Sequence, residues 1–173
     1  LLSKVQKYEG ISDNVEVEIT NYLTQISQYK LSELGRKRLR SMLKLAGDLE
    51  SIADSNYNLA RSVSRMQEKN IQFNEVAREK LDLMFNLIEE ALSVMRENLQ
   101  QDELVVSLKK SRLLEDQINN YRDQLKAEHL DNLANNVYSY EAGIIFNDLF
   151  SESEKLADYV INVSEALEEV ALR

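Results

Sequence analysis

A pair of carboxylates occurs twice in the sequence, at positions 50 and 54 and again 104 positions later. The first pair is Glu50 and Asp54, and the second is Glu154 and Asp158. In both copies an Ala stands directly before the Asp, and an Asn follows the Asp by four residues. On a helix, side chains four residues apart lie on the same face, about 5 to 6 Å apart at Cβ. Each copy therefore predicts two neighbouring carboxylates on one helix face.

Neighbouring carboxylates need a cation, a positively charged partner or protons to offset their repulsion. If the two motif helices approach each other, four carboxylates converge at the edge of the core. Oxygen ligands of this kind suit a hard cation, or iron or zinc. A further acid, Asp48 or Glu152, precedes each copy by two residues. The alternative is that the acids lie on solvated helix faces and contribute only solubility, and the spacing alone leaves both interpretations open.

The composition favours an all-α protein of one domain or two small halves. The chain has 173 residues, of which 43% are hydrophobic, with no proline and only four glycines. Sheets and turn-rich folds normally need both residues at their corners, whereas long helices do not. We expect an antiparallel bundle of about five long helices.

The charge and the missing cysteines exclude several classes of function. A formal net charge of -9 argues against a nucleic-acid partner, because such binding depends on clustered Lys and Arg. The absence of cysteine rules out disulfides and thiolate chemistry and fits a reducing compartment. The sequence has no signal peptide and no apolar run of roughly 18 residues, the length that spans a bilayer. It begins at Leu1 already in helical register, so we expect a domain of a longer protein.

Apolar residues at spacings of three and four predict five helices. Ser32, Asn74 and Asp102 are the expected N-caps of the second, third and fourth helices. A polar stretch at 127–136 predicts a frayed end or a loop, with Asn135-Asn136 as the break. The predicted helices cover 2–29 with room for a bend at Gly10, 32 to about 68, 73–100, 102–127 and 139–171.

Two of these helices carry matching apolar rows, which are typical of helices in a bundle. We expect them to bury equivalent faces. In the second helix the row is Leu39, Met42, Ala46, Leu49, Ala53, Asn56, Ala60 and Val63, flanked by Leu45, Ile52, Leu59 and Met66. In the last helix it is Phe146, Phe150, Ala157, Val160 and Leu167, flanked by Leu149, Leu156, Val163 and Val170.

A second correspondence indicates an internal duplication. The prediction is two repeats, 1–70 with two helices and 71–173 with three. A third helix of the first repeat would then lie upstream of Leu1 or be supplied by something else. The aligned residues are Glu9, Asp13, Asn14 and Ile19 with Glu115, Asn119, Asn120 and Leu125, at a nearly equal offset of 106.

The segment from Leu45 to Ala60 resembles the signature of PhoU and PhoU-like domains, and the segment from Phe146 to Val163 resembles its second copy. In particular, the chain looks like the cytosolic PhoU-like domain of bacterial sodium/phosphate cotransporters. This resemblance implies two three-helix bundles related by pseudo-twofold symmetry and a role in regulating phosphate uptake. Some PhoU proteins bind iron or zinc clusters through the motif acids, which here are Glu50, Asp54, Glu154 and Asp158. The resemblance makes Asp48 and Glu152 weaker candidates for the same site.

The sequence departs from the family pattern at two places in each copy. Ser51 and Lys155 replace an Arg, and Ala53 and Ala157 replace a Gly. The missing Arg removes positive charge that would balance the acids. Ala in place of Gly thickens the helix where a neighbour would approach.

We predict a non-enzymatic domain on the cytoplasmic side of the inner membrane, whose partner is a transporter domain of the same polypeptide. Assembly into homo-oligomers is a further possibility. The alternatives are a free-standing phosphate-signalling regulator, a structural helical-bundle adaptor, and a carboxylate-bridged metalloenzyme. The enzyme is disfavoured because the sequence lacks the Glu-x-x-His motif of di-iron proteins. We interpret His129, the only histidine, as a solvated loop residue.

One basic cluster, formed by Arg36, Lys37, Arg38 and Arg40, lies near a predicted helix start. Contact with anionic lipid headgroups or with cytosolic loops of a transporter would use such charges. The alternative is a solvated stretch that pairs with acids of neighbouring helices.

Overall fold

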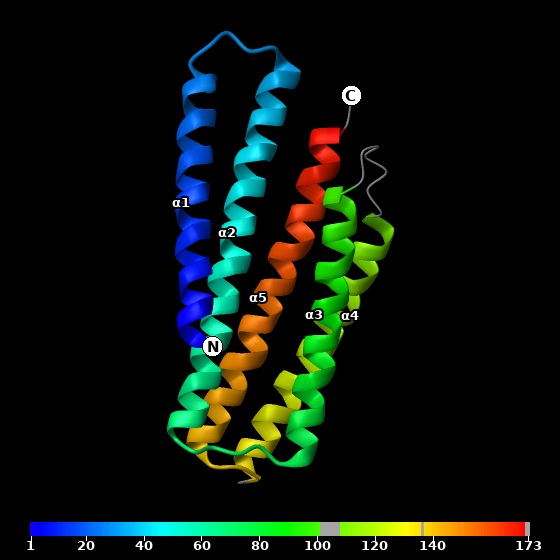
Figure 1. Cartoon of the computed structure of the whole chain (residues 1–173). Helices are drawn as coiled ribbons and strands as arrows, with labels where there is room; N and C mark the ends of the chain where they lie inside the picture. Colours follow the sequence, from blue (N-terminus) through cyan, green and yellow to red (C-terminus); the bar gives the residue numbers. More distant parts are fainter. Residues whose placement is uncertain (101–107, 136, 172–173) are drawn as a thin grey trace.

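The described part of the chain folds into five long helices, as its composition predicts. A computed structural model describes residues 1–100, 108–135 and 137–171 (Figure 1). Within these ranges the secondary structure is helical, without a strand, so the prediction of an all-α bundle is confirmed. None of the described helices has an apolar stretch long enough to cross a membrane. The helices are α1 (Leu2–Ser27), α2 (Glu33–Glu68), α3 (Glu75–Gln100), α4 (Leu108–Ala134) and α5 (Tyr140–Ala171).

Short polar side chains begin three of the helices. The Ser32 hydroxyl accepts a hydrogen bond from the Gly35 amide of α2 at 3.0 Å. The Asn74 side chain accepts one from Ala77 of α3 at 2.8 Å, and Ser139 caps α5 in the same way. These contacts satisfy amide donors that lack a partner in the first turn of a helix. The caps predicted at Ser32 and Asn74 are confirmed, whereas Asp102 lies outside the described residues.

The end of α4 differs from the sequence prediction. The polar stretch from residue 127 is helical as far as Ala134, so the expectation of a frayed end or loop there is wrong. Leu125 and His129 are both buried and lie four residues apart, so one more turn of helix extends the buried face of α4. The helix ends directly before Asn135, one half of the predicted break, and Asn136 lies outside the described residues.

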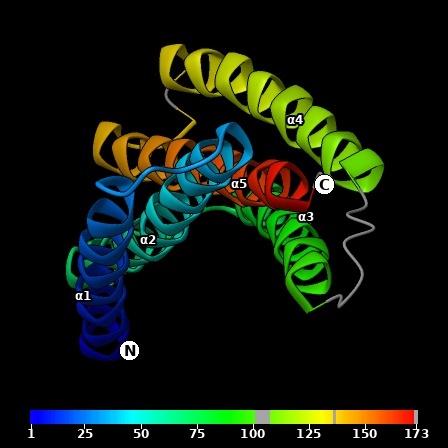
Figure 2. The same cartoon turned by 90° about the horizontal axis from the view of Figure 1, so that it is seen from above.

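The two motif helices, α2 and α5, form the central antiparallel pair. Contacts at both ends fix their direction: Arg65 forms an ion pair with Asp148, and the Ser41 hydroxyl donates a hydrogen bond to Glu169 at 2.7 Å. Helices α3, α4 and α5 pack against one another, and α1 packs against α2 on the other side (Figures 1 and 2). The motif therefore lies where a helical hairpin meets a three-helix bundle.

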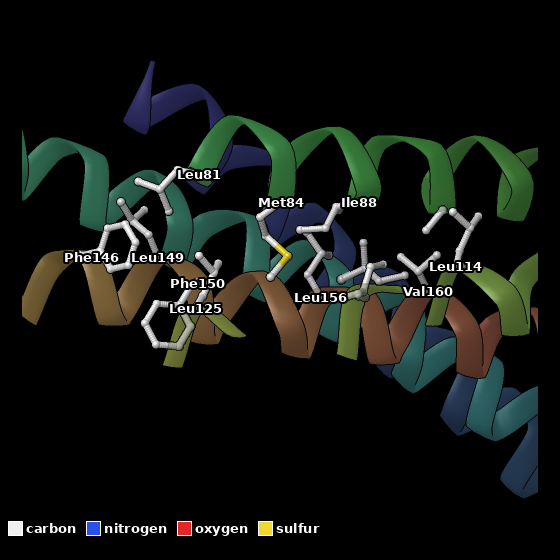
Figure 3. Packing of buried hydrophobic residues seen from close by; sticks show 14 of the residues in the cluster. Leu81, Met84, Ile88, Leu114, Leu125, Phe146, Leu149, Phe150, Leu156 and Val160 are labelled. Carbon is white, nitrogen blue, oxygen red and sulfur yellow. The ribbon is translucent and has the colours of Figure 1, made fainter. Parts of the chain in front are cut away.

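The hydrophobic core lies mainly in the three-helix bundle. Side chains of α3 such as Met84 and Ile88 meet Leu156 and Val160 of α5, and Leu114 of α4 closes the cluster (Figure 3). Burial of each such side chain contributes about 1.5 to 3 kcal/mol. In α1, by contrast, Leu23 is the one buried side chain. The second half of the chain therefore holds most of the core.

The face that α2 buries differs from the prediction. Of the expected row only Ala46 is buried, while Met42 and Asn56 are exposed. The flanking row Leu45, Ile52, Leu59 and Met66 packs on the core, together with Leu49 and Val63 of the expected row. Beside it lie the buried residues Ser41, Ser55 and Ser62, whose small side chains let α2 approach α5 closely. The two motif helices thus bury equivalent faces only in part, since Met42 and Asn56 are exposed where Phe146 and Val160 are buried.

Candidate functional site on the motif helices

The first carboxylate pair lies where α2 meets α1. Glu50 and Asp54 are half-buried, and Asp13 of α1 is close enough to repel Glu50. Burial, and then repulsion from Asp13 and Asp54, raises the pKa of Glu50, against a hydrogen bond from Ser51. Asn58 donates a hydrogen bond to Asp54 at 3.2 Å. Within the described ranges no Lys or Arg forms an ion pair with these three acids.

The second carboxylate pair lies where α5 meets α4, and it has a cation. Arg122 of α4 forms an ion pair with Glu154 and another, at 3.0 Å, with Asp123. Desolvation, and then the charge of Glu154, raises the pKa of Asp158, while Arg122 acts in the opposite direction. Arg122 therefore supplies from a neighbouring helix the positive charge that the motif itself lacks.

The four motif acids do not converge. Glu50 and Asp54 lie toward α1, whereas Glu154 and Asp158 lie toward α4. In the part of the chain that the structure describes, no three acidic, His or Cys side chains are placed to hold one metal ion. The reason is that α2 and α5 meet through serines and apolar residues, which leaves the acids at the outer edges of the contact. Iron or zinc binding through these residues stays a prediction.

Asp48, a weaker candidate, lies at the α2–α5 contact itself. Its side chain shares a hydrogen bond with Asn162, which belongs to the second motif copy. Lys44 also reaches the Asn162 side chain at 3.5 Å. Burial raises the pKa of Asp48, although Lys44 and Asn162 oppose that shift. Its Oδ2 atom is buried with no hydrogen-bond partner among the described residues, so this acid joins the two motif copies at an energetic cost.

Glu152, the other weaker candidate, lines a polar groove of about 690 Å³ between α2 and α5. Lys155 approaches Glu152 at 3.4 Å, and Arg65 of the same groove pairs with Asp148. The groove also contains Arg61 and several hydroxyl and amide side chains. Its cations are largely neutralised by its own acids, so the groove does not select a ligand of one charge.

His129 is buried, and the prediction of a solvated loop histidine is wrong. Its Nδ1 lies 2.5 Å from the Tyr138 hydroxyl, and its ring packs against the rings of Tyr138 and Phe146, each at a centroid distance of 5.8 Å. A cavity of about 160 Å³ adjoins it. The spacing of four from Leu125 was the signal in the sequence, because it continues the buried row of α4.

His129 should make the folded state less stable in mild acid. Burial lowers the pKa of His129, so below about pH 6.5 the unfolded chain takes up a proton that the folded chain does not. We expect the free energy of unfolding, measured with urea, to fall from pH 7.5 to pH 5.5. The fall should be smaller in His129→Gln. Glu50 and Asp158, whose pKa values are raised, act in the opposite direction at lower pH, and an equal fall in both proteins would contradict the prediction.

Removal of Arg122 should destabilise the α4–α5 pair. Both partners of its ion pair with Glu154 are about three-quarters buried, with side-chain exposures of 26% and 23%. Arg122→Met leaves Glu154 beside Asp158 without the cation, and we expect a loss of about 1 kcal/mol in urea unfolding. The exposed Lys126→Met on the same helix is the control and should change little. Addition of Glu154→Gln to Arg122→Met should restore part of the loss, and full additivity would show that the pair contributes nothing.

The basic cluster lies at the start of α2. Arg36 donates a hydrogen bond to the Leu31 carbonyl at 2.8 Å, and Lys37 and Arg40 are exposed. Arg38 is half-buried, and its Nε atom has no hydrogen-bond partner in the described part of the chain. None of the four forms an ion pair there, so the expected pairing with neighbouring acids is not found. Contact with anionic lipids or transporter loops stays a prediction.

Comparison with protein-family models, with curated proteins and with solved structures gave no match. The resemblance to PhoU-like domains therefore depends on the motif residues alone. The sequence did not predict that two residues, Arg122 and Asp13, would lie beside the motif acids. Arg122 carries no local signal, whereas Asp13 belongs to the correspondence between positions 9–19 and 115–125.

Proposed function

We propose that this chain is a non-enzymatic, PhoU-like regulatory domain that controls sodium-dependent phosphate uptake by contact with a membrane transporter. The observation that best supports the proposal is the pairing of the two motif copies. They lie in α2 and α5, the central antiparallel helices, and Lys44, just before the first copy, donates a hydrogen bond to Asn162 of the second copy at 3.5 Å. The resemblance to PhoU-like domains implies such an arrangement, with one copy of the signature in each of two related bundles.

The electrostatics of the site favour a role in binding or conformation over catalysis. The Ser51 hydroxyl donates a hydrogen bond to Glu50 at 3.3 Å, but the histidine and cysteine that most often serve in general acid–base or covalent catalysis are not there: the single histidine is buried against Tyr138, and the sequence has no cysteine. In one pair Glu154 has Arg122 as its ion-pair partner, and the other pair lies between two helices without an ion-pair partner among the described residues. A helical bundle of this kind acts through the contacts that its surface makes with a partner.

Phosphate uptake in cells that carry the full-length protein tests the proposal. We expect deletion of residues 1–173 to change sodium-dependent uptake of radioactive phosphate, and to abolish its decline after transfer to high phosphate. A domain supplied as a separate chain that restores regulation would favour the free-standing regulator. Uptake and its regulation that are unchanged by the deletion would overturn the proposal and leave the structural adaptor.

Metal content is a separate question, on which the two copies should differ. If iron or zinc binds at the motif, the Glu50–Asp54 pair is the better ligand, because Arg122 competes for Glu154. Elemental analysis of protein purified without chelator should then show metal that is lost in Glu50→Ala/Asp54→Ala and kept in Glu154→Ala/Asp158→Ala. Equal and negligible metal in all three proteins would remove metal from the proposal without affecting regulation by contact.

A further inference from the structure

A row of exposed side chains runs along α1 on the side that α2 does not cover. The row, here called the α1 seam, consists of Lys4, Tyr8, Ile11, Val15 and Glu18. Its spacings alternate between four and three, which places all five residues on one face of the helix, in the pattern of a coiled-coil seam. Among the described helices α1 approaches α2 alone, and Figure 2 shows it lying away from α3 and α4.

The counterparts of Lys4, Ile11 and Glu18 in the second half are exposed. Tyr8 of the seam, and Ile19 and Met42 outside it, by contrast have buried counterparts. Those counterparts belong to α4 and α5 and join the core cluster with α3 (Figure 3). The exposed fractions in equivalent pairs are 58% for Tyr8 and 2% for Leu114, 39% for Ile19 and 1% for Leu125, and 41% for Met42 and 3% for Phe146. Tyr8, Ile11 and Val15 are thus exposed apolar neighbours on one face of α1, and contiguous exposed apolar side chains mark interaction sites.

The order of residues in the seam identifies what it fits. The seam begins with the cation Lys4 and ends with the anion Glu18, and the three residues between them are apolar. Two copies in antiparallel orientation, centred on Ile11, bring Lys4 of one copy to the level of Glu18 of the other. Tyr8 then lies near Val15, and the two Ile11 side chains meet on the axis. Neither Lys4 nor Glu18 has an ion-pair partner in the described part of the chain, so both charges are available.

We propose that the α1 seam is the interface of a homodimer, in which two α1 helices pack antiparallel about a twofold axis at Ile11. An interface of this type is self-complementary, since each copy contributes the same patch. The Lys4 ammonium, which lies 5.9 Å from the centre of the Tyr8 ring, turns to Glu18 of the second copy. This assembly goes beyond the proposed regulatory function and would hold equally for a structural adaptor.

Charge reversal tests the orientation. We expect the purified chain to sediment as a dimer, and Lys4→Glu and Glu18→Lys each to weaken dimerisation by tenfold or more. An equal mixture of the two single variants should form heterodimers, because each new like-charge contact becomes an opposite-charge contact in the antiparallel pair. A chain that is monomeric at all concentrations would overturn the proposal. A dimer that is indifferent to both variants would overturn it as well.

Single cysteines test the position of the axis, and the natural chain contains no cysteine to interfere. Under oxidation Ile11→Cys should form a disulfide-linked dimer, since residues on the twofold axis come within the Cα separation of about 4.4 to 6.8 Å that a disulfide needs. Val17→Cys is the matched control, because Val17 is 53% exposed on another side of α1. Equal cross-linking of the two variants would mean that the seam is not the specific contact between copies. No cross-linking of Ile11→Cys would mean that the two Ile11 residues do not meet. Either result would overturn the proposal.

Discussion

Substitution of Leu114 by Ala should lower the free energy of unfolding by about 2 to 5 kcal/mol. Leu114 is 2% exposed and lies in the cluster that joins α3, α4 and α5 (Figure 3). Removal of its branched side chain leaves a cavity among helices that are held apart by their other side chains. Unfolding in urea followed by circular dichroism measures the change.

The neighbouring leucine provides a matched control for this prediction. Leu113 is 58% exposed on the same helix, so Leu113→Ala makes the same chemical change without a cavity. We expect its effect to stay within about 0.5 kcal/mol, as is usual for surface substitutions. Similar effects in the two variants would mean that α4 does not pack in the orientation described here.

Enlargement of Ser55 should separate the two motif helices. Ser55 is 1% exposed in α2, in the same row as Ser41 and Asp48, both of which hydrogen-bond to α5. A larger side chain has no room at such a contact, and overpacking of this kind costs about 1 to 3 kcal/mol. We expect Ser55→Leu to lower the midpoint of thermal unfolding accordingly.

Two further variants separate crowding from other effects of Ser55→Leu. Ser55→Ala removes the hydroxyl without adding volume and should change stability far less. Asn56→Leu places the same new side chain at the next position, which is exposed. A loss in Asn56→Leu as large as that in Ser55→Leu would show that leucine itself, and not crowding against α5, is responsible.

The fold was predictable because it depends on local properties of the chain. An absence of proline, alternating apolar spacings, and caps such as Ser32 and Asn74 act within a few residues of one another. The end of α4 was not predictable in this way. Its last turns are polar, and what keeps them helical is the stacking of His129 on Tyr138 and Phe146 of the neighbouring segments.

The buried face of α2 was also not predictable from local properties of the chain. Its apolar row predicted a face that would be covered, but burial requires a neighbour, and no described helix covers Met42 or Asn56. The face that packs on α5 carries small polar residues such as Ser55, which hydropathy does not distinguish from solvated serines. Their effect depends on how closely two helices approach.

The sequence by itself determined that the chain forms five helices and that two of them carry the same acidic motif. Only the tertiary structure decided the surroundings of each copy. Glu154 meets Arg122, whereas Glu50 meets Asp13, because α4 and α1 present different side chains to otherwise similar helices. Helical periodicity is a property of neighbours in the chain. The charge beside a carboxylate depends on residues that are distant in sequence, and those are brought together only when the helices pack.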